Sequence, residues 1–114
     1  MKVIIAGSRD FNNYTLLKSK CDTLLSVKRD YEIVSGTAKG ADQLGERYAT
    51  EKGYAIAKFP ADWSLGKVAG PMRNKQMAEY ADALIAFWDG ESRGTKSMID
   101  LAGKYGLKVR VVRY

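Results

Sequence analysis

Two short stretches of this chain consist entirely of apolar residues, and they constrain the fold more than any other feature. Val3–Ala6 and Ala83–Trp88 show no alternation of apolar and polar residues. A strand with one face in water alternates, whereas a strand covered on both faces does not. Both stretches therefore predict central strands of a sheet that carries helices on its two faces.

The rest of the chain alternates predicted helices with predicted strands. In Tyr14–Val27 the apolar residues recur every three or four positions, which predicts an amphipathic helix. Lys58 and Pro60, near the end of Tyr54–Phe59, favour an edge position for that strand. The other predicted strands are Glu32–Val34 and Val109–Val112; the other predicted helices are Ala41–Lys52, Pro71 to about Tyr80, and a segment capped by Thr95 and ended by Gly106.

This alternation predicts an α/β fold with a single Rossmann-like, doubly wound parallel sheet of five strands in the order 3-2-1-4-5. A chain of 114 residues can bury one core but is too short for two, so residues 1–114 are expected to form one domain. In that order the winding reverses between the first and fourth strands. Ligands of such sheets bind at this switch point, outside the carboxyl ends of the strands.

Four glycine-rich turns fall where a predicted strand or loop passes into a predicted helix. Such a turn directs free N–H groups of the helix at one edge of the sheet, where the helix dipole favours an anion. Four turns converging on that edge predict a phosphate or nucleotide site. They are Gly7–Phe11, Ser35–Asp42, Gly70–Asn74 and Trp88–Thr95.

The composition excludes several kinds of chemistry. The chain has no histidine and a single cysteine, Cys21, which rules out a Ser-His-Asp triad, a Cys-His pair and a disulfide within the chain. We therefore expect no metal and no cofactor apart from a nucleotide-like ligand. No apolar run approaches about eighteen residues and the start does not resemble a signal peptide, so a soluble, cytoplasmic protein without membrane contact is expected.

The order of motifs is similar to that of the SLOG superfamily. Gly-Ser-Arg-x-Phe follows the first strand, Ser-Gly-x-Ala-x-Gly-Ala-Asp the second, Gly-Pro-x-Arg-Asn opens the third helix and Gly-Thr lies beyond the fourth strand. The set runs from about Lys2 to Tyr114 and most resembles the small YspA/YpsA-related branch. The resemblance implies a Rossmann-like domain that binds nucleotides or molecules derived from them.

Relatives in this superfamily differ in function, so the resemblance leaves the activity open. The LOG phosphoribohydrolases cleave the N-glycosidic bond of cytokinin nucleotides, and DprA binds single-stranded DNA. The LOG enzymes pair an arginine, matched here by Arg73, with a glutamate whose position is occupied by Met98. A thioether cannot move a proton, so hydrolysis would need Asp89 or Glu91 in that role. The candidate catalytic residues are accordingly Arg73, Asp89 and Glu91.

The leading hypothesis is a sensor, sequestering protein or processing module that binds a nucleotide-derived ligand. Asp42 is expected to cap a helix rather than to catalyse, and Trp88 fits packing at the rim about as well as stacking. The predicted ligand-binding residues are Gly7, Ser8, Arg9, Ser35, Gly36, Thr37, Gly40, Arg73, Asn74, Gly94 and Thr95, with Trp63 and Trp88 as candidates for stacking on a base.

Two alternatives and one assembly state remain open. The first alternative is a nucleotide N-glycosidase or phosphohydrolase, and the second is DprA-like binding of single-stranded DNA, favoured by the net charge of +6. The basic residues are spread along the chain, which ranks nucleic acid last. Met72, Met77 and Tyr80 on the third helix predict a two-fold homodimer, as in LOG relatives, although the same residue types also suit a core.

Overall fold

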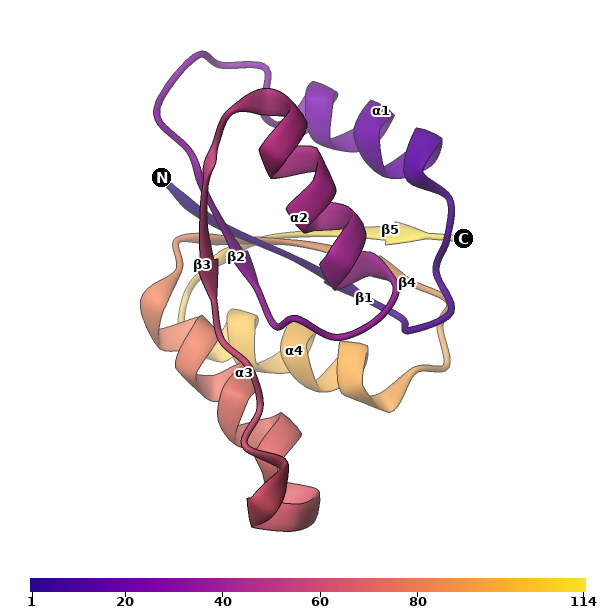
Figure 1. Ribbon diagram of the computed structural model, residues 1–114, viewed down its shortest axis with the longest axis vertical. Coiled ribbons are helices and arrows are strands. Elements are labelled where there is room, and N and C mark those ends of the chain that lie inside the picture. The colour runs from indigo at the N-terminus through magenta and orange to yellow at the C-terminus, as the bar shows by residue number, and fades with distance from the viewer.

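The computed structural model describes residues 1–114 and contains one sheet of five parallel strands in the order β3-β2-β1-β4-β5. Helices α1 and α2 cover one face and α3 and α4 cover the other (Figure 1). The predicted fold class and strand order are confirmed. In chain order the elements are β1 Lys2–Gly7, α1 Tyr14–Leu24, β2 Glu32–Ser35, α2 Ala41–Lys52, β3 Ala55–Lys58, the 3-10 helix η1 Trp63–Val68, α3 Ala69–Tyr80, β4 Ala83–Trp88, α4 Arg93–Lys104 and β5 Lys108–Arg113.

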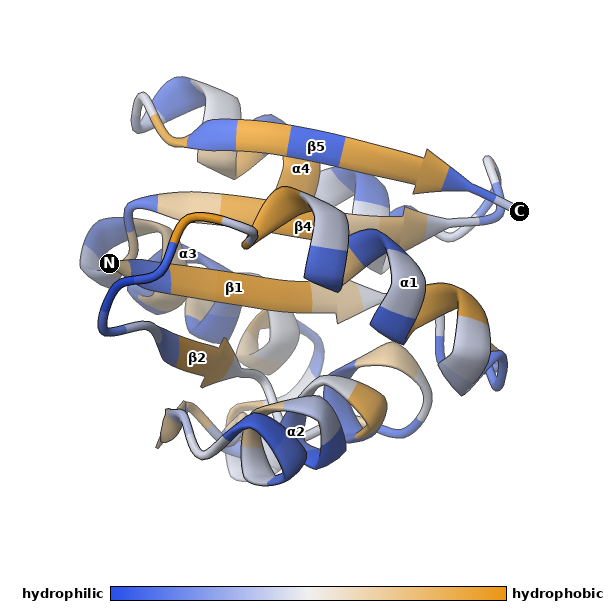
Figure 2. Cartoon of the chain, turned by 90° about the horizontal axis from the view of Figure 1, so that it is seen from above, coloured by the Kyte–Doolittle hydropathy of each residue, from blue (hydrophilic) through white to orange (hydrophobic).

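The central strands β1 and β4 divide the core into two halves. Val3 and Ile5 pack into the half under α1 and α2, whereas Ile4 and Ala6 pack into the half under α3 and α4. Because consecutive side chains of a strand point to opposite faces, an unbroken apolar run fills both halves. Figure 2 shows this run along β1 and, in contrast, alternating basic and apolar residues along β5, which is an edge strand.

Several element boundaries differ from the sequence prediction. Helix α1 ends at Leu24, because the backbone of the cap residue Leu25 is no longer helical (φ −106°, ψ 35°), and Val27 beyond it is 57% exposed. Helix α3 begins at Ala69, two residues before Pro71. Proline is tolerated there because the first N–H groups of a helix have no partner within the helix.

The segment before α3 was missed from the sequence. Trp63–Val68 forms η1, with a non-helical residue at Gly66 (φ 70°, ψ −140°) and no buried side chain. It extends beyond the sheet at the lower end of Figure 1. Without a buried face, this segment has no apolar periodicity from which a helix could be predicted. None of the helices in the chain is both long and apolar enough to cross a membrane.

Candidate anion-binding cleft

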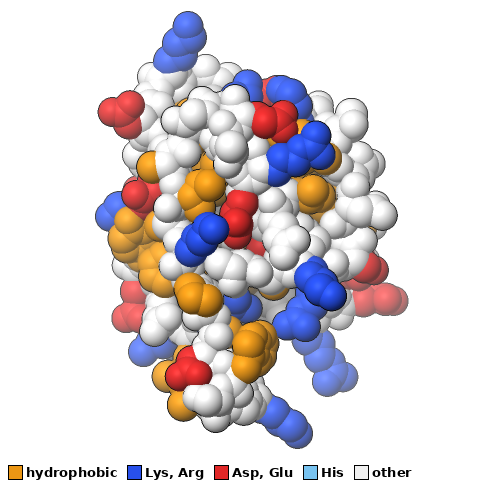
Figure 3. All heavy atoms as spheres, in the orientation of Figure 1, with side chains coloured by type: hydrophobic (Ala, Val, Ile, Leu, Met, Phe, Trp, Pro, Cys, Tyr) orange, Lys and Arg blue, Asp and Glu red, His pale blue; other side chains and the backbone are white.

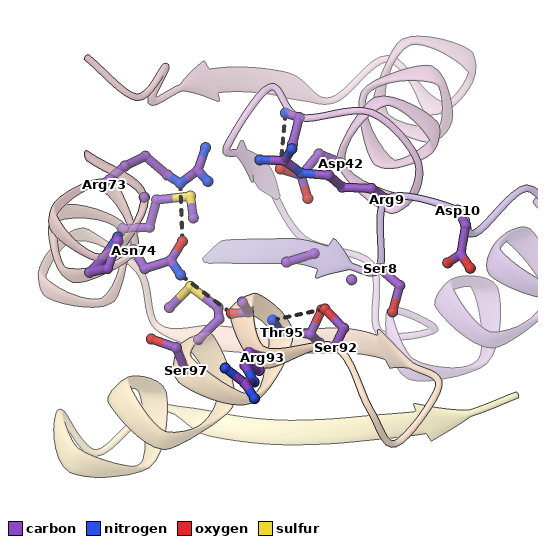
Figure 4. A pocket seen from close by; sticks show the side chains of 18 of the residues that line it. Ser8, Arg9, Asp10, Asp42, Arg73, Asn74, Ser92, Arg93, Thr95 and Ser97 are labelled. Carbon is purple, nitrogen blue, oxygen red and sulfur yellow. Dashed lines mark hydrogen bonds between the residues drawn. The ribbon is translucent and has the colours of Figure 1, made fainter. Parts of the chain in front are cut away.

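A cleft of about 580 Å³ lies outside the carboxyl ends of β1 and β4, at the predicted switch point of the sheet (Figure 4). Clefts that bind small molecules typically have volumes of roughly 300–1,000 Å³. Segments far apart in the sequence supply its walls. They include Gly7 at the end of β1, Ser8, Arg9 and Asp10 after it, Ala38 and Asp42 around the start of α2, Trp63 of η1, Gly70, Arg73 and Asn74 of α3, and Asp89, Ser92, Arg93, Gly94 and Thr95 around the start of α4.

The start of α4 forms one wall of the cleft and is held in place by its own side chains. Ser92, rather than the predicted Thr95, caps the helix: its hydroxyl accepts a hydrogen bond from the Thr95 amide at 3.4 Å. Asp89 Oδ1 accepts from the amides of Glu91 (2.9 Å) and Ser92 (2.8 Å), and these bonds lower the pKa of Asp89. The first amides of a helix attract anions, so this wall is prepared for a negatively charged group.

Gly94 is the second residue of α4 and leaves that wall open. A Cβ atom added at Gly94 would meet no atom of the chain within 4 Å. The glycine is therefore not required by packing of the chain. Its absence of a side chain leaves room for a ligand to approach the helix start.

Three arginines line the cleft, and they differ in how strongly the chain holds them. Arg9 and Arg93 are exposed and take part in none of the five salt bridges of the chain. Arg73 is only 9% exposed, and its guanidinium donates to the Gly36 carbonyl and, at 3.0 Å, to Asn74 Oδ1. Burial lowers the pKa of Arg73. Arg73 thus stabilises the wall, whereas Arg9 and Arg93 are available to a ligand.

Asp42 is a buried carboxylate that also lines the cleft. It lies in the first turn of α2, as expected, but it does not cap the helix, because Gly40 occupies the cap position without a side-chain bond. Asp42 Oδ2 accepts a hydrogen bond from the Ala38 amide at 3.2 Å. Burial raises the pKa of Asp42 to about 6, against the opposing effects of the Ala38 amide and of the nearby Arg73 and Arg9.

Most of the predicted glycine-rich loop after β2 lies behind the cleft wall. Ser35, Gly36, Thr37 and Gly40 do not line the cleft, although Ala38 and Asp42 do. A Cβ at Gly36 would lie 2.7 Å from Asp42 Oδ2, and Gly40 has a φ of 82° with the Ser8 carbonyl 2.4 Å from an added Cβ. These two glycines are explained by close packing of the chain. Their part in phosphate binding stays a prediction.

The two tryptophans occupy different surroundings. Trp63 is 59% exposed, lines the cleft and lies under the Arg9 guanidinium at 5.7 Å from the ring centre. Trp88 lies outside the lining, and its indole N–H donates to the Ser92 carbonyl at 3.0 Å. Only Trp63 is therefore placed where it could stack on a bound base.

The structure also separates the candidate catalytic carboxylates. Asp89 lines the cleft, whereas Glu91 is exposed outside it. Met98, at the position of the LOG glutamate, is 2% exposed and belongs to the core under α3 and α4. The base of the cleft is apolar at this point.

Asp10, Ser92 and Arg93 line the cleft and lie in the predicted turns, but they were not among the predicted ligand-binding residues. Ser92 lies three residues before Thr95 and carries the usual residue type of a helix cap, so it could have been found from the sequence. Ser8, which was predicted, is buried and its hydroxyl has no hydrogen-bond partner in the chain.

The residues proposed for a homodimer do not share one surface. Met77 is buried in the core and Tyr80 donates a hydrogen bond to Glu32, so of the three only Met72 is an exposed apolar side chain. The dimer stays a prediction.

Comparisons with known proteins concern the family and the fold. The model of the YspA, cpYpsA-related SLOG family matches residues 1–66. The Gene 61 protein of Mycobacterium phage D29 is 34% identical over 116 residues, which cover 95% of this chain and 93% of that protein. DNA processing protein A from Helicobacter pylori, which binds single-stranded DNA, is similar in structure with a TM-score of 0.69 and 22% identity. That alignment covers 100% of this chain and 66% of the longer one, and at this identity the likeness concerns the fold.

Proposed function

Because the chain belongs to the YspA, cpYpsA-related SLOG family, we propose that it binds a nucleotide or nucleotide-derived small molecule in the cleft between β1 and β4. In this role it acts as a sensor, a sequestering protein or a processing module. Membership of the family confirms the resemblance that the turn motifs predicted. The ligand itself is a matter for experiment.

One observation carries the proposal. The start of α4 and two arginines that form no salt bridge, Arg9 and Arg93, line the same cleft. Helix N-termini and arginine side chains both bind phosphate groups. A cleft with both, and with space for a nucleotide, is suited to a phosphorylated ligand.

The cleft also suggests how the ligand lies. A phosphate group at the start of α4 would contact the amides near Gly94 and the Arg93 side chain. Trp63 and Arg9 lie on the wall formed after β1 and by η1, where a flat base could stack on the exposed indole. Base and phosphate would then occupy different walls of one cleft.

Calorimetric titration with AMP and with ADP-ribose tests the proposal. Arg9→Ala removes an exposed side chain that takes part in none of the salt bridges of the chain, so the fold should be retained while affinity falls about tenfold or more. Arg29→Ala is the control, because it removes the same charge from an exposed loop outside the cleft. Equal affinity for the wild type and Arg9→Ala would refute the assignment of the site, and no binding of either nucleotide would count against the function.

Hydrolysis is the first alternative, and the observation that favours it is that Arg73 and Asp89 line the same cleft. Incubation with nucleoside monophosphates and ADP-ribose, followed by chromatography for released base or phosphate, decides between binding and turnover. If the wild type releases base or phosphate and Asp89→Asn does not, the protein is an enzyme. Unchanged nucleotides would leave a sensor or sequestering protein.

Binding of single-stranded DNA is the second alternative, favoured by the fold shared with DNA processing protein A. Figure 3 shows Lys and Arg side chains scattered over the visible face and separated by acidic and uncharged residues. DNA binding would weaken steeply with added salt. A single phosphorylated ligand in the cleft should respond less to salt and only to Arg9→Ala.

A further inference from the structure

Asp42 is a buried acidic residue in a cleft that also contains two exposed arginines, Arg9 and Arg93, without salt bridges. The side chain is 5% exposed, and its one hydrogen bond is that from the Ala38 amide to Oδ2. Arg73 lies near it but donates to Gly36 and Asn74 instead. The carboxyl group therefore faces the cleft without an ion pair to neutralise it.

We infer that Asp42 is a proton-carrying binding residue of the cleft: it takes up a proton when a phosphorylated ligand occupies the cleft, and it then donates a hydrogen bond to a phosphate oxygen of that ligand. The proton comes from solvent and returns to it on release, and no covalent bond changes. This inference rests on the proposed function and adds that the cleft binds its anion together with one proton.

The groups around Asp42 have opposing effects on whether its side chain is a carboxylate or a protonated acid. Arg9 from the loop after β1 and Arg73 from α3 favour the carboxylate, as does the Ala38 amide. Burial and Glu46, one turn further along α2, favour the protonated acid. The resulting pKa of about 6 means that a small change in the surroundings can add or remove the proton near neutral pH.

A bound phosphate changes those surroundings in one direction. Its negative charge repels the carboxylate and offsets the positive charge of the cleft arginines that stabilises the carboxylate, and the ligand excludes water from the cleft. All three effects favour the protonated acid. A carboxylic acid can donate to a phosphate oxygen, whereas a carboxylate has no proton to donate.

The coupling has a measurable consequence for affinity. Where binding takes up one proton, the affinity rises up to about tenfold for each unit by which the pH falls. ADP-ribose is a suitable probe because its pyrophosphate does not titrate between pH 6 and 8. Its affinity should increase between pH 8 and pH 6, with the proton uptake measured by calorimetry in buffers of different ionisation enthalpy.

Asp42→Asn supplies the decisive variant. The amide is neutral at every pH and can still accept the Ala38 hydrogen bond, so ADP-ribose should bind more tightly than to the wild type at pH 8, with no proton uptake and a flat pH profile. Glu79→Gln is the matched control: it removes one negative charge from an exposed position of α3 outside the cleft lining, and it should keep the proton uptake. Thermal unfolding verifies that both variants fold.

A second measurement follows Asp42 directly. The carboxyl ¹³C signal of Asp42 should titrate near pH 6 in the free protein and at higher pH in the presence of sulfate, a dianion that does not itself titrate in this range. Three results would overturn the inference and leave the proposed function intact. They are ADP-ribose binding without proton uptake, sulfate binding without a shift in the Asp42 titration, and weaker ADP-ribose binding by Asp42→Asn than by the wild type. Failure of both anions to bind the wild type would refute the proposed function and the inference together.

Discussion

Replacing Gly94 with alanine separates the ligand role of the α4 start from its structural role. Gly94 lines the cleft at the second position of the helix, and an added Cβ meets nothing of the chain within 4 Å. Glycine in a helix costs roughly 0.5–1 kcal/mol relative to alanine. Gly94→Ala should therefore leave the free energy of unfolding unchanged or raise it by up to about 1 kcal/mol.

Ligand binding should change in the opposite direction. The methyl group would occupy space that a phosphate needs to reach the amides at the start of α4, so we expect about a tenfold or greater loss of affinity. A more stable protein that binds less well cannot be explained by a damaged fold. This pairing of outcomes is what makes the substitution informative.

Gly103→Ala is the matched control on the same helix. Gly103 is exposed near the end of α4, outside the cleft, and its added Cβ also meets nothing within 4 Å. Chemical denaturation and calorimetric titration of AMP should show similar stabilisation in both variants but weaker binding only in Gly94→Ala. Undiminished binding by Gly94→Ala would refute the reasoning about the α4 wall.

Three further predictions concern single residues. Burial raises the pKa of Asp42 from 3.8 to about 6, so the protonated acid contributes fully to stability below pH 4 and this contribution is lost as the pH rises to about 6. In urea denaturation, the free energy of unfolding of Asp42→Asn should therefore equal that of the wild type below pH 4 and exceed it by up to about 3 kcal/mol at pH 7.5. Trp63→Ala removes an exposed side chain, so its melting temperature should change little while nucleotide affinity falls several-fold in titrations; unchanged affinity would exclude stacking. Burial raises the pKa of Cys21 to about 12, so a thiol reagent should modify the native protein at pH 8 only at the rate of unfolding, and fast modification would show that α1 opens.

The sequence predicted the sheet well because its central strands carry a strong signal. The unbroken runs in β1 and β4 could be read without knowledge of their partners, and glycine at the turns indicated where strands pass into helices. The pattern failed where no face is buried, as in η1, and where two residues of similar type compete for one role, as Ser92 and Thr95 do for the cap of α4.

The candidate site was predicted less completely, because its chemistry depends on contacts between distant segments. Gly36 is constrained by Arg73, which lies 37 residues further along the chain, and no local pattern indicates that contact. The burial of Asp42 depends in the same way on how the surrounding segments pack. Arg9 and Trp63 were selected from the sequence separately, and their shared cleft wall became visible only in the structure.

Amide chemical shifts measured during a titration with ADP-ribose test the central claim most directly. Binding in the cleft predicts the largest ¹H–¹⁵N shifts at Ser8 and Arg9 after β1 and at Arg93, Gly94 and Thr95 at the start of α4, with little change along β5. Saturable shifts confined to these residues would support a ligand site at the switch point of the sheet. Absence of shifts at the start of α4, or shifts concentrated on β5 and α1, would contradict it.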